Sequence, residues 1–155
     1  MTEMTAGRSR LRHDNSAAAF AGLERTRRQN GDPRGDLCLR VVVAQSDLKP
    51  ADSGLRKWVV SLMETAAGVR AEARSKGRVL TAAAPNLSVR HPLRVGDVVS
   101  VYTRIRKVGH TSLTISVEAY ALRRYLQEEV LVTEGEFILV AVDDDGVPRM
   151  LPFAA

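Results

Sequence analysis

The sequence predicts an α+β protein in which one long helix packs against a sheet of antiparallel strands. Two observations lead to this prediction. Apolar residues recur at the helical spacing of about 3.6 between residues 54 and 75, and they alternate with polar residues between residues 112 and 122, as in a strand. Short turn-forming stretches such as GHTS and DDDG separate the later segments, so the strands are expected to follow one another as an antiparallel meander.

The elements can be read in order from their local patterns. The expected elements are a β-branched strand at 37–46, a loop at 47–53, the helix at 54–75, a second strand within 76–89, a turn at 90–97, and strands at 98–108, 112–122 and 130–143. Gly77 follows the helix as a stop signal. One helix can cover only one face of such a sheet, which suggests that chains associate to cover the rest.

Composition limits the possible classes of protein. A chain of 155 residues with 45% hydrophobic and 26% charged residues is expected to form one globular domain. No apolar run reaches the roughly 18 residues that cross a membrane, and the first residues lack the apolar stretch of a secretory signal. Cys38 is the single cysteine, which excludes an intramolecular disulfide and a multi-cysteine zinc site. We therefore expect a cytoplasmic protein that holds no metal.

The net charge of +5 suggests an anionic partner. The basic residues are scattered, however, aromatic residues make up only 5% of the chain, and no nucleic-acid-binding motif is present. We expect neither nucleic acid nor a membrane as partner. A polyanionic small molecule fits the charge as well.

Residues 1–35 have a different character from the rest. They are rich in Arg and Ala and end in the turn-forming stretch NGDPRGD, which predicts an N-terminal extension, flexible or docked, before a single domain at 36–155. A mitochondrial-type presequence would explain the Arg and Ala content. The acids Glu3, Asp14 and Glu24 argue against it.

The helix carries one acid in unusual surroundings. Its apolar stripe, predicted to face the sheet, consists of Leu55, Trp58, Val59, Leu62, Met63, Ala66, Val69 and Ala73. Glu64 lies on the other side, among Val60, Ala67, Gly68 and Ala71, with no Lys or Arg three or four residues away. A carboxylate among small apolar residues predicts an interface and a functional role.

Three ordered motifs carry a family resemblance. They are P-x-x-V-G-D-x-V at Pro92–Val99, V-G-x-T-S-L at Val108–Leu113, and T-E-x-x-F, V-A-V-D and G-x-P-R within Thr133–Arg149. In this order they resemble the bacterial hotdog-fold acyl-CoA thioester hydrolases, over roughly residues 46–152. The resemblance implies a hotdog fold, in which a curved antiparallel sheet of about five strands wraps a long helix. It also implies sheets paired edge to edge in dimers, active sites between subunits, and hexamers built as trimers of dimers.

The same resemblance implies a catalytic residue. The family's helix reads W-x-x-x-x-M-D-x-A-G-G, and Trp58, Met63 and Gly68 match it with Glu64 at the position of the Asp. Glu64 would then activate the water that cleaves the thioester, giving CoA and a carboxylic acid. No cofactor is implied, since CoA is part of the substrate. The family's glycine pair before the Trp is replaced by Arg56 and Lys57.

Several residues are candidate contacts for the substrate or for CoA. They are Trp58, Thr81, Asn86, Arg104, Lys107, Gly109, His110, Thr111 and Ser112. Arg104 and Lys107 would hold phosphates, Asn86 would lie in the strand that lines the substrate tunnel, and the turn from Gly109 would lie near CoA. Asp47 and Asp52 are alternative carboxylates. A second interpretation is a non-catalytic acyl-CoA-binding hotdog protein with a degenerate active site.

Overall fold

The computed structural model describes residues 34–47 and 53–152, which belong to one compact unit beginning at Arg34. Its elements in chain order are β1 (Asp36–Val42), the 3-10 turn η1 (Gln45–Asp47), α2 (Ser53–Ser75), β2 (Val79–Ala83), β3 (Ser88–Val89), β4 (Val98–Val108), β5 (Ser112–Arg123) and β6 (Glu128–Ala141). The predicted extension, residues 1–35, lies almost entirely outside the described residues, as do residues 48–52.

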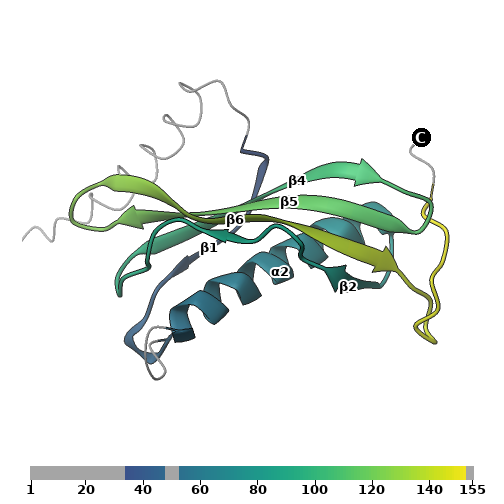
Figure 1. Ribbon diagram of the computed structural model, residues 1–155, viewed down its shortest axis with the longest axis horizontal. Helices are drawn as coiled ribbons and strands as arrows, with labels where there is room; N and C mark the ends of the chain where they lie inside the picture. Colours follow the sequence, from purple (N-terminus) through teal and green to yellow (C-terminus); the bar gives the residue numbers. More distant parts are fainter. Residues whose placement is uncertain (1–33, 48–52, 153–155) are drawn as a thin grey trace, which may run out of the picture. The chain divides into compact units, whose positions relative to one another are not determined.

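All strands belong to one antiparallel sheet that arches over α2 (Figure 1). The strand order is β1-β4-β5-β6-β2, and β3 pairs with β6. The predicted architecture of one helix against an antiparallel meander is therefore confirmed. The sheet has six strands where about five were expected, because the segment predicted as one strand within residues 76–89 contains both β2 and the short β3.

The core lies between α2 and the inner face of the sheet. Inward-facing residues of β4, β5 and β6, such as Val101, Ile115 and Phe137, pack against it and are at most 2% exposed. On the helix, the fully buried apolar residues are Val59, Met63, Ala66, Ala67 and Ala71. Alanines at these positions let the helix approach the sheet closely.

This buried stripe differs from the predicted one. Val69 is 53% exposed and Ala73 is also exposed, whereas Ala67 and Ala71 are at 0%. The helix is thus rotated relative to the prediction, which assigned the inner face by side-chain size. Because small residues face the sheet, the larger Val69 is left on the outer surface.

Gly135 of β6 allows the turn before β3 to lie against the sheet. A Cβ added at Gly135 would lie 2.8 Å from Leu87 Cδ2 and 3.0 Å from the carbonyl oxygen of Asn86. Gly135→Ala is therefore expected to lower the free energy of unfolding by about 1–3 kcal/mol through overpacking. Urea denaturation followed by circular dichroism measures this, and an unchanged midpoint would contradict the close approach.

The G-x-P-R motif has a structural role. The Arg149 guanidinium lies against Gly77, donates from Nε to the carbonyl of Val142 at 3.0 Å, and donates from Nη1 to the carbonyl of Ser75 at 3.1 Å. It thereby ties the C-terminal segment to the end of α2 and satisfies a carbonyl there.

Within the described residues, no helix is both long and apolar enough to cross a bilayer.

Candidate active site

Glu64 lies on an open flank of α2. Cys38 Sγ lies 3.8 Å from the carbonyl oxygen of Ala66, and Arg70 forms a 2.8 Å ion pair with Asp36, so this flank of the helix faces β1. Two residues turn an α-helix by about 200°, so Glu64 lies on the opposite flank, toward β2. Its side chain is exposed, and nothing lies within 4 Å of a Cβ added at Gly68, one turn later. The flank is therefore open to another molecule.

The β2 strand is the free edge on the same side. Among the described residues it pairs only with β6, so its outer edge has no strand beside it. Leu80 is 45% exposed, and Thr81, Ala82 and Ala83 are exposed as well. An apolar, unpaired edge strand is a template for pairing with another chain.

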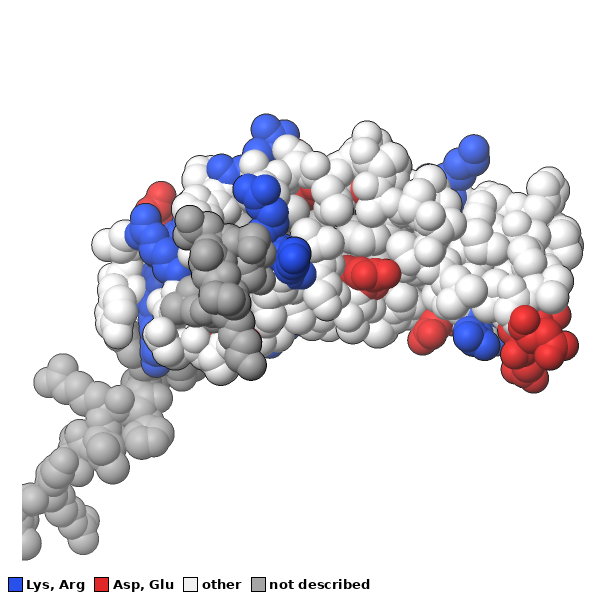
Figure 2. Space-filling view, turned by 60° about the horizontal axis from the view of Figure 1, so that its bottom comes forward, with Lys and Arg blue, Asp and Glu red and all other residues white. Residues whose placement is uncertain are grey.

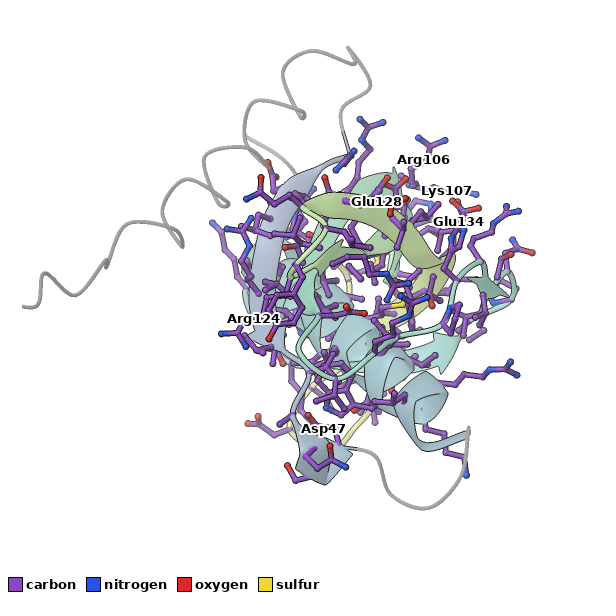
Figure 3. The ribbon with its side chains drawn as sticks, turned by 90° about the vertical axis from the view of Figure 1, so that its left-hand side faces the viewer. Asp47, Arg106, Lys107, Arg124, Glu128 and Glu134 are labelled. Carbon is purple, nitrogen blue, oxygen red and sulfur yellow. The ribbon has the colours of Figure 1, made fainter. Side chains whose placement is uncertain are left out.

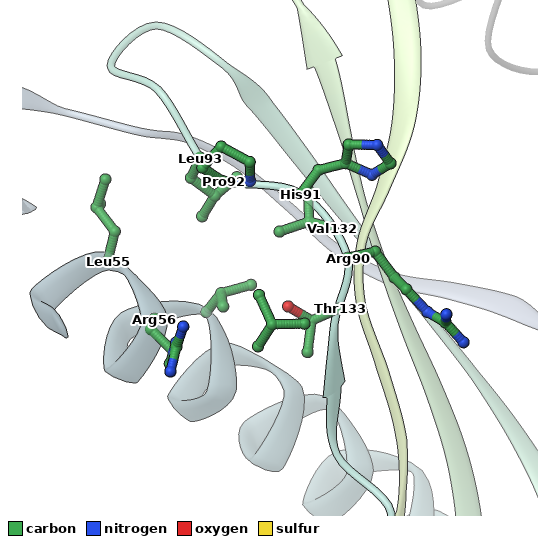
Figure 4. Close-up of a pocket in the computed structure, with 10 residues that line it drawn as sticks. Leu55, Arg56, Arg90, His91, Pro92, Leu93, Val132 and Thr133 are labelled. Carbon is green, nitrogen blue, oxygen red and sulfur yellow. The ribbon is translucent and has the colours of Figure 1, made fainter. Parts of the chain in front are cut away.

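A cavity of about 640 Å³ lies beneath the start of α2 (Figure 4). Its lining consists of Leu55, Arg56, Val59, Val89, Arg90, His91, Pro92, Leu93, Val132 and Thr133. Arg90 and His91 point away from α2 (Figure 4). Arg90 pairs with Glu134 at 2.6 Å, and His91 Nδ1 lies 2.8 Å from the carbonyl oxygen of Leu131. The polar groups on the helix side are those of Arg56 and Thr133.

A buried ion pair braces one wall of this cavity. The Arg123 guanidinium donates to the carboxylate of Asp97, and both side chains are less than a tenth exposed. Arg123 also donates to the carbonyl of Pro92 at 2.8 Å, and the Asp97 carboxylate accepts the backbone N–H of Arg94 at 2.8 Å. The aspartate of the P-x-x-V-G-D-x-V motif thus holds the loop that carries Pro92 and Leu93.

Comparison with known proteins decides the family. Residues 58–127 match the Thioesterase superfamily. The acyl-CoA thioester hydrolase YciA of Salmonella typhimurium is 34% identical over 123 residues, which cover 77% of this chain and 92% of the relative. The chain belongs to the hotdog-fold acyl-CoA thioester hydrolase family.

Solved structures of hotdog hydrolases have the same fold. A hexameric thioesterase from Yersinia pestis aligns with a TM-score of 0.72 at 33% identity, covering 79% of this chain and 100% of that one. A hexameric hotdog fold thioesterase of Campylobacter jejuni aligns with a TM-score of 0.72 at 28% identity, covering 78% of this chain and 93% of that one.

The turn Gly109–Ser112, which was predicted to bind CoA, lies away from the cavity. Gly109 donates its N–H to the carbonyl of Ser112, and the carbonyls of Thr111 and His110 accept N–H groups of Ala141 and Leu151, each at 2.8 Å. The turn therefore lies at the end of β6. Ala141 is eight residues along the strand from Thr133, which corresponds to about 26 Å.

The other predicted contacts are dispersed in the single chain. Thr81 is exposed on β2, opposite Leu139. Asn86 lies in the turn between β2 and β3, so its prediction as a strand residue was wrong. Arg104 pairs in register with Ser116 on the sheet face away from α2. Trp58 is half-buried against the core, about 120° around the helix from Glu64.

The alternative carboxylate Asp47 is engaged in its own turn. It accepts the N–H of Ala44 at 2.8 Å, and its own N–H donates to the Ala44 carbonyl at 3.0 Å. Figure 3 shows Asp47 at the opposite side of the molecule from Arg106 and Lys107. Asp47 therefore stabilises local structure apart from the predicted phosphate contacts. Asp52 lies outside the described residues.

Charge is unevenly distributed on the helix side of the molecule. Figure 2 shows Lys and Arg side chains gathered at the end where α2 begins. Acidic side chains gather at the other end, where the turn at 143–145 lies. The end that holds the cavity is thus the basic one, which favours anionic ligands there.

Cys38 has a thiol that could react with the thiol reagent used to measure CoA release. Burial raises its pKa, although the Arg70 guanidinium acts in the opposite direction. At about pH 8, where a free thiol is partly ionised, Cys38 is expected to react with a thiol reagent several times more slowly than CoA does. The rates with native protein, denatured protein and free CoA test this. Equal rates for native and denatured protein would contradict the shielding.

Proposed function

We propose that this chain hydrolyses acyl-CoA thioesters, with Glu64 as the general base, at a site completed by a second copy of the chain. The position of Glu64 supports this proposal most strongly. The side chain is exposed on the flank of α2 that faces the free edge of β2, so a copy that paired with β2 would approach the acid.

The proposed reaction needs one carboxylate and water. Glu64 takes a proton from water while the water oxygen bonds to the thioester carbonyl carbon. The tetrahedral intermediate then collapses, its C–S bond breaks, and the sulfur of CoA leaves and receives the proton. The products are CoA and a carboxylic acid. CoA enters as substrate, and this chemistry calls for no metal or additional cofactor.

We propose a dimer formed through β2 and a trimer of such dimers. The Yersinia pestis and Campylobacter jejuni relatives are hexamers. Pairing of two β2 strands would join two sheets, cover Leu80 and close the open flank around Glu64. Residues 36–155 would form the single domain of each subunit, working in the cytoplasm, with 1–35 as an extension.

Lys107, Arg104 and the turn Gly109–Ser112 remain proposed contacts for the phosphates of CoA. Lys107 is exposed, and it lies two residues before this turn. Thr81 and Asn86 are exposed along the β2 side, where the second subunit would lie. A substrate held between subunits could contact groups that are dispersed in one chain.

The replacement of the family's glycine pair favours a second candidate, a binding protein without turnover. Arg56 and Lys57 place long side chains where glycines would let a substrate approach the backbone. CoA release from acetyl- to palmitoyl-CoA, measured with a thiol reagent, separates the two functions. Turnover supports the hydrolase. CoA binding without turnover at any chain length would overturn it in favour of the binding protein.

A further inference from the structure

The cavity beneath α2 has apolar walls and two polar groups of defined position. Leu55, Val59, Leu93 and Val132 supply apolar surface, and the volume of about 640 Å³ suits a small organic group. Figure 4 shows the hydroxyl oxygen of Thr133 on the side that faces α2, where Arg56 lies.

The Thr133 hydroxyl is buried and makes no hydrogen bond within the described part of the chain. Thr133 is 0% exposed, and its Oγ1 has no hydrogen-bond partner among residues 34–47 and 53–152. Leaving a buried hydroxyl unpaired costs about 1–3 kcal/mol. A ligand group that accepts its hydrogen bond would remove this cost, so the site calls for a polar atom inside an otherwise apolar cavity.

Arg56 places a positive charge near the N-terminus of α2, where it does not stabilise the helix. The first turn of α2 contains no acidic residue, and Arg56 forms no ion pair with any described residue. A cation near a helix N-terminus is unfavourable, because the helix dipole is already positive there. Arg56 and the helix start together create a positive field at the cavity, and such a field binds an anion.

We infer that the cavity receives an acyl group with a second carboxylate at its far end, the monothioester of a dicarboxylic acid. The carboxylate would accept hydrogen bonds from the Arg56 guanidinium and the Thr133 hydroxyl, while the methylene groups contact Leu55, Val59 and Leu93. A plain fatty acyl chain would leave Thr133 unpaired and remove water from Arg56 without compensation. This inference rests on the proposed hydrolase function and specifies its substrate class.

Matched pairs of thioesters test the inference by kinetics. Succinyl- against butyryl-CoA and adipyl- against hexanoyl-CoA differ only in the terminal carboxylate. The wild type is expected to have the higher kcat/KM for the dicarboxylic member of a pair, by about tenfold or more. Arg56→Gln should lower that ratio by about the same factor. The exposed Arg78, in the turn after α2, provides the control, since Arg78→Gln should leave the ratio unchanged.

Binding of free dicarboxylates gives a readout that needs no turnover. Adipate, compared with hexanoate, should raise the Tm of the wild type in a concentration-dependent way. Thr133→Val keeps the side-chain shape and removes the hydroxyl. The ligand-free variant should be at least as stable as the wild type, and the Tm rise with adipate should shrink. A variant that is less stable without ligand would indicate a structural role for Thr133 and contradict the inference.

The outcomes separate this inference from the proposed function. Equal kcat/KM for the dicarboxylic and the plain acyl thioesters would overturn the inference, and so would a preference for the dicarboxylic members that persists in Arg56→Gln. Either result is compatible with the proposed hydrolase function. If no thioester is hydrolysed, the proposed hydrolase function is overturned. In that case the adipate measurement still decides whether the cavity binds dicarboxylates.

Discussion

Replacing Glu64 with Gln is expected to lower kcat for acyl-CoA hydrolysis by about 100-fold or more, because general base catalysis contributes roughly 10²–10⁴ to such reactions. Glutamine keeps the size and polarity of the side chain but cannot accept the proton of the attacking water. A 100-fold lower kcat corresponds to an activation free energy that is higher by about 2.7 kcal/mol. The affinity for CoA should change little, since the proposed phosphate contacts lie elsewhere.

Thiol release with equal concentrations of both proteins measures the effect. Glu72→Gln is the matched control, because Glu72 is an exposed acid farther along the same helix. Its kcat should equal that of the wild type. Glu64→Asp retains a carboxylate but shortens the reach by one methylene, so its activity should fall between those of the wild type and Glu64→Gln. Full activity in Glu64→Gln would move the base to another residue.

Removing the carboxylate of Asp97 is expected to destabilise the fold by about 3–5 kcal/mol. Asp97→Ala leaves the Arg123 guanidinium buried without its counterion and frees the backbone N–H of Arg94. The loop that carries Pro92 and Leu93 loses its anchor, so activity should fall as well. The expected loss is a large part of the stability of a single domain, typically about 5–15 kcal/mol.

The double variant Asp97→Ala with Arg123→Met tests whether the unpaired charge causes the loss. Removing both partners should cost less than the sum of the two single losses, because no charge remains buried alone. Guanidinium denaturation of the single and double variants measures the coupling. Additive losses would contradict the interpretation that the pair acts as a unit.

Hairpin strands could be predicted accurately from the sequence. The strand at 98–108 was predicted with the bounds that the structure shows, and 112–122 differs from β5 by one residue. Strict alternation of side chains together with short turns determines both the extent and the pairing of such strands. The short β3 could not be predicted, because its two residues form a strand only through contact with the distant β6.

The helix face was harder to predict, because size and burial do not always agree. Leu62 and Val69 have larger apolar side chains than Ala67 and Ala71, yet the alanines are the buried ones. A helix that packs closely against a sheet requires small residues at the contact. A helical wheel that ranks residues by hydrophobicity does not predict this, because it assigns the larger apolar side chains to the buried face. The same error affected the predicted surroundings of Glu64: Ala67 and Ala71, which were expected beside it on the outer face, are buried in the core, whereas Glu64 itself is exposed.

The cavity was missed for a similar reason. Thr133 lies in a strand where threonine is an ordinary choice, and its burial depends on pairing with Ala119 and on α2 above it. In the sequence, Arg56 stands out only as the replacement of a glycine. The signal that could have identified it was a basic residue at a helix start, where the dipole disfavours a cation.

The exposure of Glu64 means that the proposed catalytic base is not one of the residues that stabilise the fold. Its side chain supports no core contact, whereas Asp97, Arg123 and Gly135 hold the loops and strands in place. Mutation at position 64 is therefore free of the folding constraint that most buried positions impose. Over evolutionary time such a scaffold can exchange one acid for another, or lose the acid entirely, while the same protein continues to accumulate in the cell.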